Sequence, residues 1–287
     1  MTAALDRTRH SAGSAGRSAG PRLVASDVDG TLMRPDGVIS ERTRAACRAV
    51  RDAGLEMVFV TGRPIRWLGP LEEQLGHCGT VICSNGAVVW DMSRRKVLFT
   101  EAFGREQALQ LQGVLRALHP AAGFSAELVT GPHREPEFLR LHPSLPVEDQ
   151  VTGPLGTTLP ANARVVKLLA ISPVLTAEEF HALVAPAVKG LAHVTYSDVN
   201  RVALLEFSLP GVTKARTLEA FAKSRGIGAS EVIAFGDMPN DVQMLAWAGE
   251  GYAMADGHPE ARAAARFEAP RCRDDGVALV LESVLAG

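Results

Sequence analysis

Two aspartates spaced two residues apart follow a short apolar run near the start of the chain. The run is Leu23–Ala25, the acids are Asp27 and Asp29, and Gly30 and Thr31 come directly after them. The pattern predicts a short buried strand that ends in a turn carrying two carboxylates. Such a site is suited to holding a divalent cation and attacking a phosphoryl group, but it needs further cation ligands, donors for phosphate oxygens and a positive charge.

Further polar segments follow other predicted strands. Glu56–Val60 leads into Thr61, Gly62 and Arg63, and Thr80–Cys83 leads into Ser84–Ala87. Later in the chain, Glu231–Phe235 leads into a segment with three polar side chains, namely Asp237, Asn240 and Asp241. Strands that alternate with helices indicate a parallel sheet, whose ligand site lies beyond the carboxyl ends of the strands. We therefore expect these segments to meet at one edge of a sheet.

Helical segments separate these strands. Ser40 is placed to cap a helix with an apolar face of Ala45, Ala49, Val50 and Ala53. Thr213 is placed to cap a second helix over 214–225, which puts Lys214 in its first turn. We expect Tyr252–Met254 to be the last strand of the sheet.

The pattern changes between residues 88 and 208. Hairpin-like strands at 87–90 and 96–99, a helix over 105–118, and a capping box of Thr176 and Glu179 predict an inserted α+β domain. Residues 131–162 contain six prolines, from which we expect a long irregular loop.

Composition excludes several classes of protein. The chain has 287 residues, 46% of them apolar, and a net charge of −2, so neither nucleic acid nor an anionic membrane is an expected partner. No apolar run reaches the length of a membrane span. Cys47, Cys78, Cys83 and Cys272 lack metal-binding spacing and are expected to be reduced thiols in the cytoplasm. Residues 1–20 are rich in Ala, Gly, Ser and Arg, which predicts a disordered tail without a secretory signal.

Four motifs, in this order, resemble those of the haloacid dehalogenase superfamily. They are Asp27-x-Asp29-Gly-Thr, Thr61-Gly-Arg, Lys214, and Gly236-Asp-x-x-Asn-Asp241. The segments 84–87 and 274–278 resemble the Cof-type, sugar-phosphatase-like branch. The resemblance covers residues 21 to 285. It implies an α/β fold with a Rossmann-like parallel-sheet core at 21–87 and 209–287, and an inserted α+β cap at 88–208.

The same resemblance implies different catalytic roles for Asp27 and Asp29. Asp27 is expected to be the nucleophile that forms an aspartyl-phosphate, and Asp29 the general acid and base. Mg²⁺ is the expected cofactor. Its expected ligands are Asp27, the backbone carbonyl of Asp29, and Asp237, with Asp241 acting through water or in support of these ligands. Catalytic or phosphate-binding roles are implied for Thr61, Gly62, Lys214 and Asn240.

Taken alone, each motif has an ordinary structural explanation, such as a turn, a helix cap or a solvated lysine; their order and placement favour the chemical interpretation. The resulting hypothesis is a magnesium-dependent phosphatase that hydrolyses a small phosphorylated metabolite. A phosphomutase or phosphotransferase on the same scaffold is the main alternative, and a non-catalytic binding protein is a second. The sequence indicates neither the substrate nor the oligomeric state.

Other polar residues carry weaker expectations. Arg63 is a candidate phosphate contact, and Lys167 and Arg201 are candidates for reading an anionic substrate. Ordinary packing or solvation is expected for the loop and strand residues His133, Arg140, His142, His193 and Tyr196. Asp256 stands where Cof-type sequences often have an asparagine, so no role is transferred to it.

Overall fold

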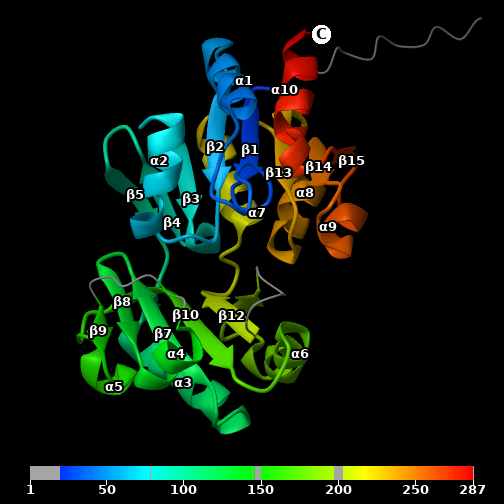
Figure 1. Ribbon diagram of the computed structural model, residues 1–287. Coiled ribbons are helices and arrows are strands. Elements are labelled where there is room, and N and C mark those ends of the chain that lie inside the picture. Colours follow the sequence, from blue (N-terminus) through cyan, green and yellow to red (C-terminus); the bar gives the residue numbers. More distant parts are fainter. Residues whose placement is uncertain (1–19, 78, 144, 146–149, 197–202, 287) are drawn as a thin grey trace, which may run out of the picture.

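The computed structural model describes residues 20–77, 79–143, 145, 150–196 and 203–286. They form two β-sheets that lie one beyond the other, each with its own helices (Figure 1). The expectations for the tail before Gly20, for Cys78 and for Arg201 fall outside the described residues. In the described part of the chain, no helix is both long enough and apolar enough to cross a membrane.

The first sheet has eight strands in the order β15-β14-β13-β1-β2-β3-β4-β5, with β1 between β13 and β2. The neighbours from β15 to β3 run parallel, whereas β4 and β5 are antiparallel additions. The strands are β1 (Leu23–Asp27), β2 (Glu56–Val60), β3 (Thr80–Cys83), β4 (Val88–Asp91), β5 (Lys96–Thr100), β13 (Val232–Gly236), β14 (Glu250–Met254) and β15 (Phe267–Ala269).

Helices cover both faces of this sheet and bury two separate apolar clusters against it (Figure 1). One group is α1 (Glu41–Asp52), α2 (Gly69–Leu75) and α10 (Gly276–Ala286); the other is α7 (Lys214–Ser224), α8 (Val242–Trp247) and α9 (Pro259–Ala264). Short 3₁₀ turns are η1 (Ile65–Trp67), η2 (Ser84–Gly86), η3 (Ala229–Glu231), η4 (Pro239–Asp241) and η5 (Cys272–Asp274).

The predicted helix caps are confirmed. The Ser40 hydroxyl accepts a hydrogen bond from the Thr43 amide, and the Thr213 hydroxyl accepts one from the Arg216 amide. The predicted apolar face of α1 is wrong except for Val50, because Ala45, Ala49 and Ala53 are exposed and Ala53 is the C-cap. The face that packs on the sheet is instead formed by Thr43, Ala46, Cys47 and Val50.

The second sheet runs β11-β12-β10-β7-β8-β9, with β6 paired to β10. Its strands are β6 (Phe103–Gly104), β7 (Gly123–Leu128), β8 (Gly131–Arg134), β9 (Val151–Thr152), β10 (Arg164–Ser172), β11 (His193–Thr195) and β12 (Ala203–Ser208). Its helices are α3 (Arg105–Leu118), α4 (Pro136–Leu141), α5 (Leu155–Thr158) and α6 (Ala177–Val188). We call this sheet with its helices the cap.

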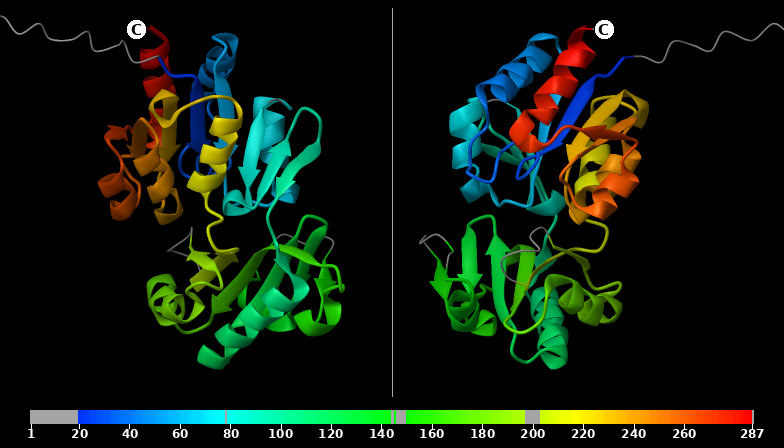
Figure 2. Two further views of the ribbon diagram at one scale, coloured as in Figure 1. Left: turned by 180° about the vertical axis from the view of Figure 1, so that it is seen from behind. Right: turned by 45° about the vertical axis from the view of Figure 1, so that its right-hand side comes forward.

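The cap sheet lies between the first sheet and helices α3 and α6 (Figure 2). These two helices bury a third apolar cluster against the far face of the cap sheet. The capping box at the start of α6 is confirmed. The Thr176 hydroxyl accepts a hydrogen bond from the Glu179 amide, and the Glu179 carboxylate accepts one from the Thr176 amide. The expected fold, a parallel-sheet core with an inserted α+β domain, is therefore confirmed.

Three expectations about individual elements are corrected. The hairpin of 88–100 pairs with β3 and extends the first sheet, so the pairing favours an insert that begins after Thr100. The described part of residues 131–162 contains two strands and two short helices; Pro136 begins one helix and Pro154 directly precedes the other, positions that tolerate proline. Tyr252–Met254 is not the last strand, since β15 adds a further parallel neighbour.

Candidate active site

Asp27 is the last residue of the central strand β1, and its loop turns sharply toward the loop after β13. Gly30 makes this turn with a φ of 83°, a conformation that L side chains rarely adopt. A Cβ atom added at Gly30 would lie 2.5 Å from Oδ2 of Asp237. The absence of a side chain at Gly30 therefore lets the two acidic loops approach each other closely.

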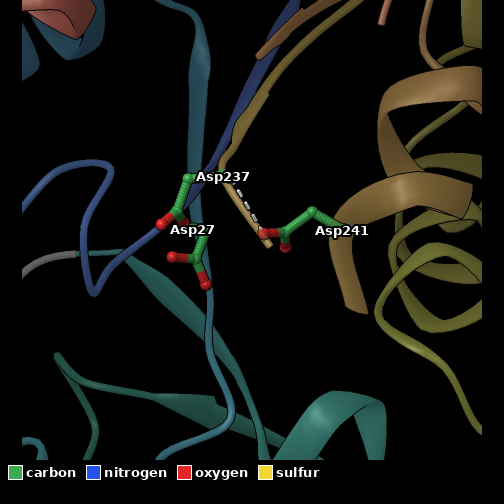
Figure 3. Close-up of side chains that lie close together, drawn as sticks. All are labelled: Asp27, Asp237 and Asp241. Carbon is green, nitrogen blue, oxygen red and sulfur yellow. Dashed lines mark hydrogen bonds between the residues drawn. The ribbon is translucent and has the colours of Figure 1, made fainter. Parts of the chain in front are cut away.

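Three carboxylates gather where these loops meet (Figure 3). Asp27, Asp237 and Asp241 each place one carboxylate oxygen so that the three oxygens lie within 4.8 Å of one another. Asp27 is 5% exposed and Asp241 is fully buried. Burial, together with the Asp241 charge, raises the pKa of Asp237 to about 7. Burial and the mutual repulsion of these carboxylates thus both disfavour the charged form of Asp237.

Lys214 supplies one positive charge to this cluster. Its Nζ lies 2.5 Å from Oδ1 of Asp27 and 2.8 Å from Oδ1 of Asp241, and the lysine is 2% exposed. Burial alone would lower the pKa of Lys214, but Asp241 and Asp27 outweigh it and raise the pKa, so the side chain is an ammonium ion. Burial raises the pKa of Asp27 and the Lys214 charge opposes that shift.

Asp241 is held by its own loop. Its Oδ2 accepts hydrogen bonds from the backbone amides of Asp237 and Met238, at 3.1 and 3.0 Å. Asp237 is held from the other side by the Thr31 hydroxyl, which donates to its Oδ1 over 2.9 Å. Both oxygens of Asp241 are thus engaged, which suits the supporting role expected for it.

Asp29 lies nearby but faces a different partner. Its side chain is 53% exposed and forms a two-pronged ion pair with Arg63, whose Nε lies 2.8 Å from Oδ2 of Asp29. The sequence suggests Arg63 as a phosphate contact; in this structure its guanidinium holds Asp29 instead.

The loop after β2 brings the second motif to the same edge. Thr61 is fully buried, and its hydroxyl accepts a hydrogen bond from the Arg63 amide over 3.0 Å. Gly62 lines the cavity described below, as do Asn240 and Lys214. The structure therefore brings all of the predicted site residues to one edge of the sheet, although the Thr61 hydroxyl is used within its own turn.

A cavity of about 660 Å³ separates this edge from the cap. From the first domain it is lined by Asp27, Asp29, Gly62, Arg63, Pro64, Arg66, Trp67, Pro70, Lys214, Met238 and Asn240. The cap contributes Glu127, Arg134, Phe138, His142, Leu145, Lys167, Leu169, Leu204 and Glu206. Asp256 lies in a turn and is not among the described residues that line the cavity.

Two cap residues differ from what the sequence alone predicts. Lys167, a candidate for reading an anionic substrate, is buried and paired with Glu206, with its Nζ 2.6 Å from Oε1 of Glu206. Sequence reasoning missed Glu206 itself. Its signal was a lone carboxylate in the apolar strand β12, opposite the strand that carries Lys167, since isolated charges in such strands are seldom buried without a partner.

The three-carboxylate cluster fits Mg²⁺. It offers only hard oxygen donors, which this ion prefers, and the Lys214 ammonium is hydrogen-bonded to two of the three carboxylates, those of Asp27 and Asp241. Burial is the first cause of the raised pKa of Asp237, and the neighbouring Asp241 charge adds to it, so a bound cation would favour the charged form of this carboxyl group. Asp27 and Asp237, supported by Asp241, are the residues that would hold the ion.

Comparison with known proteins agrees with this geometry. The sequence model of a family described as haloacid dehalogenase-like hydrolases matches residues 24–281. The chain is 25% identical to the pyridoxal phosphate phosphatase YbhA of Escherichia coli, over 92% of this chain and 98% of that protein. It is 27% identical to the HMP-PP phosphatase of Cronobacter sakazakii, over 83% of this chain and 86% of that protein.

Solved structures share the fold. BT1666 from Bacteroides thetaiotaomicron superposes with a TM-score of 0.79 at 22% identity, covering 96% of this chain and 99% of its own. SMU.1108c from Streptococcus mutans gives a TM-score of 0.79 at 22% identity, covering 93% of this chain and 100% of its own. These likenesses extend over both the first domain and the cap.

Proposed function

We propose, from the premise that the chain belongs to the haloacid dehalogenase-like hydrolase family, that it is a Mg²⁺-dependent phosphatase of a small phosphorylated metabolite. One observation carries the proposal. The buried Asp27 carboxylate, paired with the Lys214 ammonium, lines a cavity beneath the cap that Asp29 also lines. A nucleophile, a proton carrier and a cation thus surround one space large enough for a phosphomonoester.

In the first step, a carboxylate oxygen of Asp27 attacks the phosphorus atom of the substrate. A bond forms between that oxygen and phosphorus, and the bond from phosphorus to the leaving oxygen breaks. Asp29 has to enter this step as the carboxylic acid, released from Arg63, and it gives its proton to the leaving oxygen, so the alcohol departs neutral. The product of this step is an aspartyl-phosphate on Asp27.

In the second step, Asp29 takes a proton from a water molecule as the water oxygen attacks phosphorus. The bond between phosphorus and Asp27 breaks, which releases inorganic phosphate and restores both carboxyl groups. For Asp29 to act in either step, its carboxylate has to leave the Arg63 pair seen here or share Arg63 with the substrate.

Charge stabilisation is divided among residues at the cavity. Lys214 lies at the N-terminus of α7, where its ammonium and the helix dipole both favour an anion. Gly62 and Asn240 offer donors at the ends of β2 and β13. When bound, Mg²⁺ supplies Lewis-acid stabilisation of the phosphoryl oxygens.

The relatives and the cavity support the proposed substrate class. The two relatives named above are phosphatases of pyridoxal phosphate and of HMP-PP. A cavity lined by Trp67, Phe138 and several charged groups suits a small polar metabolite of similar size. We place the reaction in the cytoplasm, which cell fractionation would test.

The experiment is phosphate release from a panel of phosphorylated metabolites with Mg²⁺, using the Asp27→Asn variant as the blank. The expected result is release of inorganic phosphate by the wild-type protein and none above background by Asp27→Asn. Formation of an isomeric phosphate ester without free phosphate would replace the proposal with a phosphomutase. Equal release by Asp27→Asn would rule out the covalent mechanism.

A further inference from the structure

A chain of buried and partly buried polar side chains crosses from the cap to the loop that carries Asp237 and Asp241. Its members are Lys167 and Glu206 of the cap, Asn85 of η2, and Asn240 of η4. Lys167 donates to Oε1 of Glu206, Asn85 Nδ2 donates to Oε2 of Glu206, and Asn240 Nδ2 donates to Oδ1 of Asn85 over 3.1 Å.

The direction of these hydrogen bonds is fixed by chemistry. A glutamate carboxylate only accepts, so Asn85 must turn its amide nitrogen toward Glu206. Its carbonyl oxygen is then left facing Asn240, which must present its own amide nitrogen. Since each member dictates the orientation of the next, Glu206 determines from the cap how the Asn240 amide is oriented at the cavity.

The burial, backbone conformation and hydrogen bonds of Asn85 suit it to connect Glu206 with Asn240. It is 3% exposed and has a φ of 56°, in the left-handed region that asparagine tolerates better than most residues. Its amide nitrogen also reaches Oγ1 of Thr195 in the cap over 3.4 Å. Both hydrogens of its amide nitrogen are thus directed to cap groups, and its oxygen is directed to the loop after β13.

The other end of the same ion pair holds the loop after β2. Lys167 Nζ donates to the backbone carbonyl of Gly62 over 2.7 Å, while Glu206 neutralises its charge. A Cβ atom at Gly62 would lie 3.2 Å from Oδ1 of Asn85 and 3.6 Å from Oε2 of Glu206, so this loop packs directly on the chain of hydrogen bonds. One buried cap ion pair is therefore linked to both loops that offer donors to phosphate.

We propose that Glu206 and Lys167 are positioning residues, which assemble the phosphate-binding loops through Asn85 when the cap lies over the site. This inference rests on the proposed function for its meaning in catalysis. The cap then does more than cover the cavity, because the orientation of Asn240 depends on a carboxylate that only the cap provides. A phosphomonoester would meet fully ordered donors only under a seated cap.

The hydrogen bonds between these side chains can be disrupted and restored by substitutions that keep the size and shape of each side chain. Asn85→Asp places a carboxylate against Glu206, and Glu206→Gln leaves one carbonyl oxygen to serve both Lys167 and Asn85. In the double variant Asn85→Asp with Glu206→Gln, the new amide nitrogen at position 206 donates to the new carboxylate at position 85. That carboxylate also accepts from Asn240. Every donor in this set of side chains again meets an acceptor, and their summed charge equals that of the wild type.

The readout that does not depend on catalysis is hydrogen exchange of the backbone amides in peptides covering 236–242, which include the amides held by Asp241. We expect faster exchange in Asn85→Asp and recovery in the double variant. Affinity for inorganic phosphate with Mg²⁺, measured by calorimetry, should fall roughly tenfold or more in each single variant and return to within about threefold in the double variant.

A matched control exists in the cap. Glu135 is also buried, and it also accepts from an amide (Gln112) and from a cation (Arg116). It is not among the described residues that line the cavity. Glu135→Gln should therefore lower the melting temperature but leave exchange in 236–242 and phosphate affinity at wild-type values.

The outcomes separate the two proposals. Wild-type exchange in Asn85→Asp, or no recovery in the double variant, would overturn the positioning role. If the wild-type protein released no phosphate from any substrate, the proposed function would fail, but the exchange experiment would still decide whether the cap orders this loop.

Discussion

Arg63 and Asp29 form a two-pronged ion pair at the cavity, with Arg63 Nε 2.8 Å from Oδ2 of Asp29. The arginine comes from the loop after β2 and the aspartate from the loop after β1, so the pair joins two adjacent motifs. It holds the carboxylate that we assign to proton transfer at the edge of the site. Asp29 is thereby kept beside the substrate cavity without entering the buried carboxylate cluster.

The role of Asp29 predicts a separation of binding from turnover. Asp29→Asn keeps the shape of the side chain but removes proton transfer, so kcat should fall by about 100-fold or more, the usual contribution of a general acid and base. Affinity for inorganic phosphate should change little. Steady-state kinetics and calorimetry measure the two effects. Asp52→Asn, at an exposed position of α1, is the control, and more than half of wild-type kcat in Asp29→Asn would contradict the assignment.

We expect the Lys214→Ala variant to depend more on Mg²⁺ for its stability than the wild type does. Lys214→Ala leaves Asp27 and Asp241 buried without their cation, and breaking a buried ion pair costs about 3–5 kcal/mol. In EDTA, the free energy of unfolding should fall by about that amount. Mg²⁺ should restore more stability to the variant than it adds to the wild type, since the ion replaces the missing charge.

Chemical denaturation with and without Mg²⁺ measures this effect. Lys223→Ala, at an exposed position of the same helix, should behave as the wild type in both conditions. Equal stabilisation of Lys214→Ala and the wild type by Mg²⁺ would show that the ion does not bind beside Asp27.

His119 predicts a loss of stability in acid. Burial lowers its pKa below the ordinary value of 6.5, and its Nε2 lies 2.9 Å from the Ser172 hydroxyl. Below pH 6.5 the unfolded chain binds a proton at His119 that the folded chain resists, so the contribution of His119 to stability falls as pH decreases. The slope from one such group is at most about 1.4 kcal/mol per pH unit.

Unfolding by urea between about pH 5 and 7.5, the range in which histidine titrates, checks this prediction. His119→Gln should flatten the pH dependence in the acid range, whereas His77→Gln, at a position 62% exposed, should leave it unchanged. An unchanged slope in His119→Gln would assign the acid sensitivity to other groups.

The local patterns of the sequence predicted the strands and helix caps that place the site. Asp27, Lys214 and Asp237 lie at or next to the ends of regular elements, so strand and cap signals were enough to bring them to one edge. The α1 face was misplaced because alanines are tolerated in both exposed and buried positions, whereas the burial of Cys47 and Thr43 depends on packing against the sheet.

Contacts between side chains far apart in the sequence could not be predicted in the same way. The Arg63–Asp29 pair and the Asn85–Glu206 contact join residues 34 and 121 positions apart, and their pairing depends on tertiary packing, for Glu206 on how the cap sits over the sheet. The hairpin of 88–100 was misassigned for a related reason. A hairpin is a local signal, but the sheet that it joins is chosen by tertiary packing.

We expect substitution of Gly30 to lower the free energy of unfolding by more than backbone strain alone would. Gly30→Ala adds a Cβ atom 2.5 Å from Asp237 Oδ2 at a residue with φ of 83°, so it strains the backbone and also pushes on a carboxylate of the cluster. Gly37 offers a matched control, because its φ is 81° but no atom lies within 4 Å of its added Cβ. Gly37→Ala therefore suffers only the strain of the left-handed backbone, about 1 kcal/mol.

We expect both variants to be destabilised, Gly30→Ala by more than Gly37→Ala, and only Gly30→Ala to lose affinity for Mg²⁺. Urea unfolding and Mg²⁺ titration followed by calorimetry measure the two quantities. The difference between the variants isolates the contact with Asp237 from the backbone strain that they share. Equal Mg²⁺ affinity in the two variants would mean that Asp237 can move away from the new side chain without loss, and that the close approach of the two loops is not needed to hold the ion.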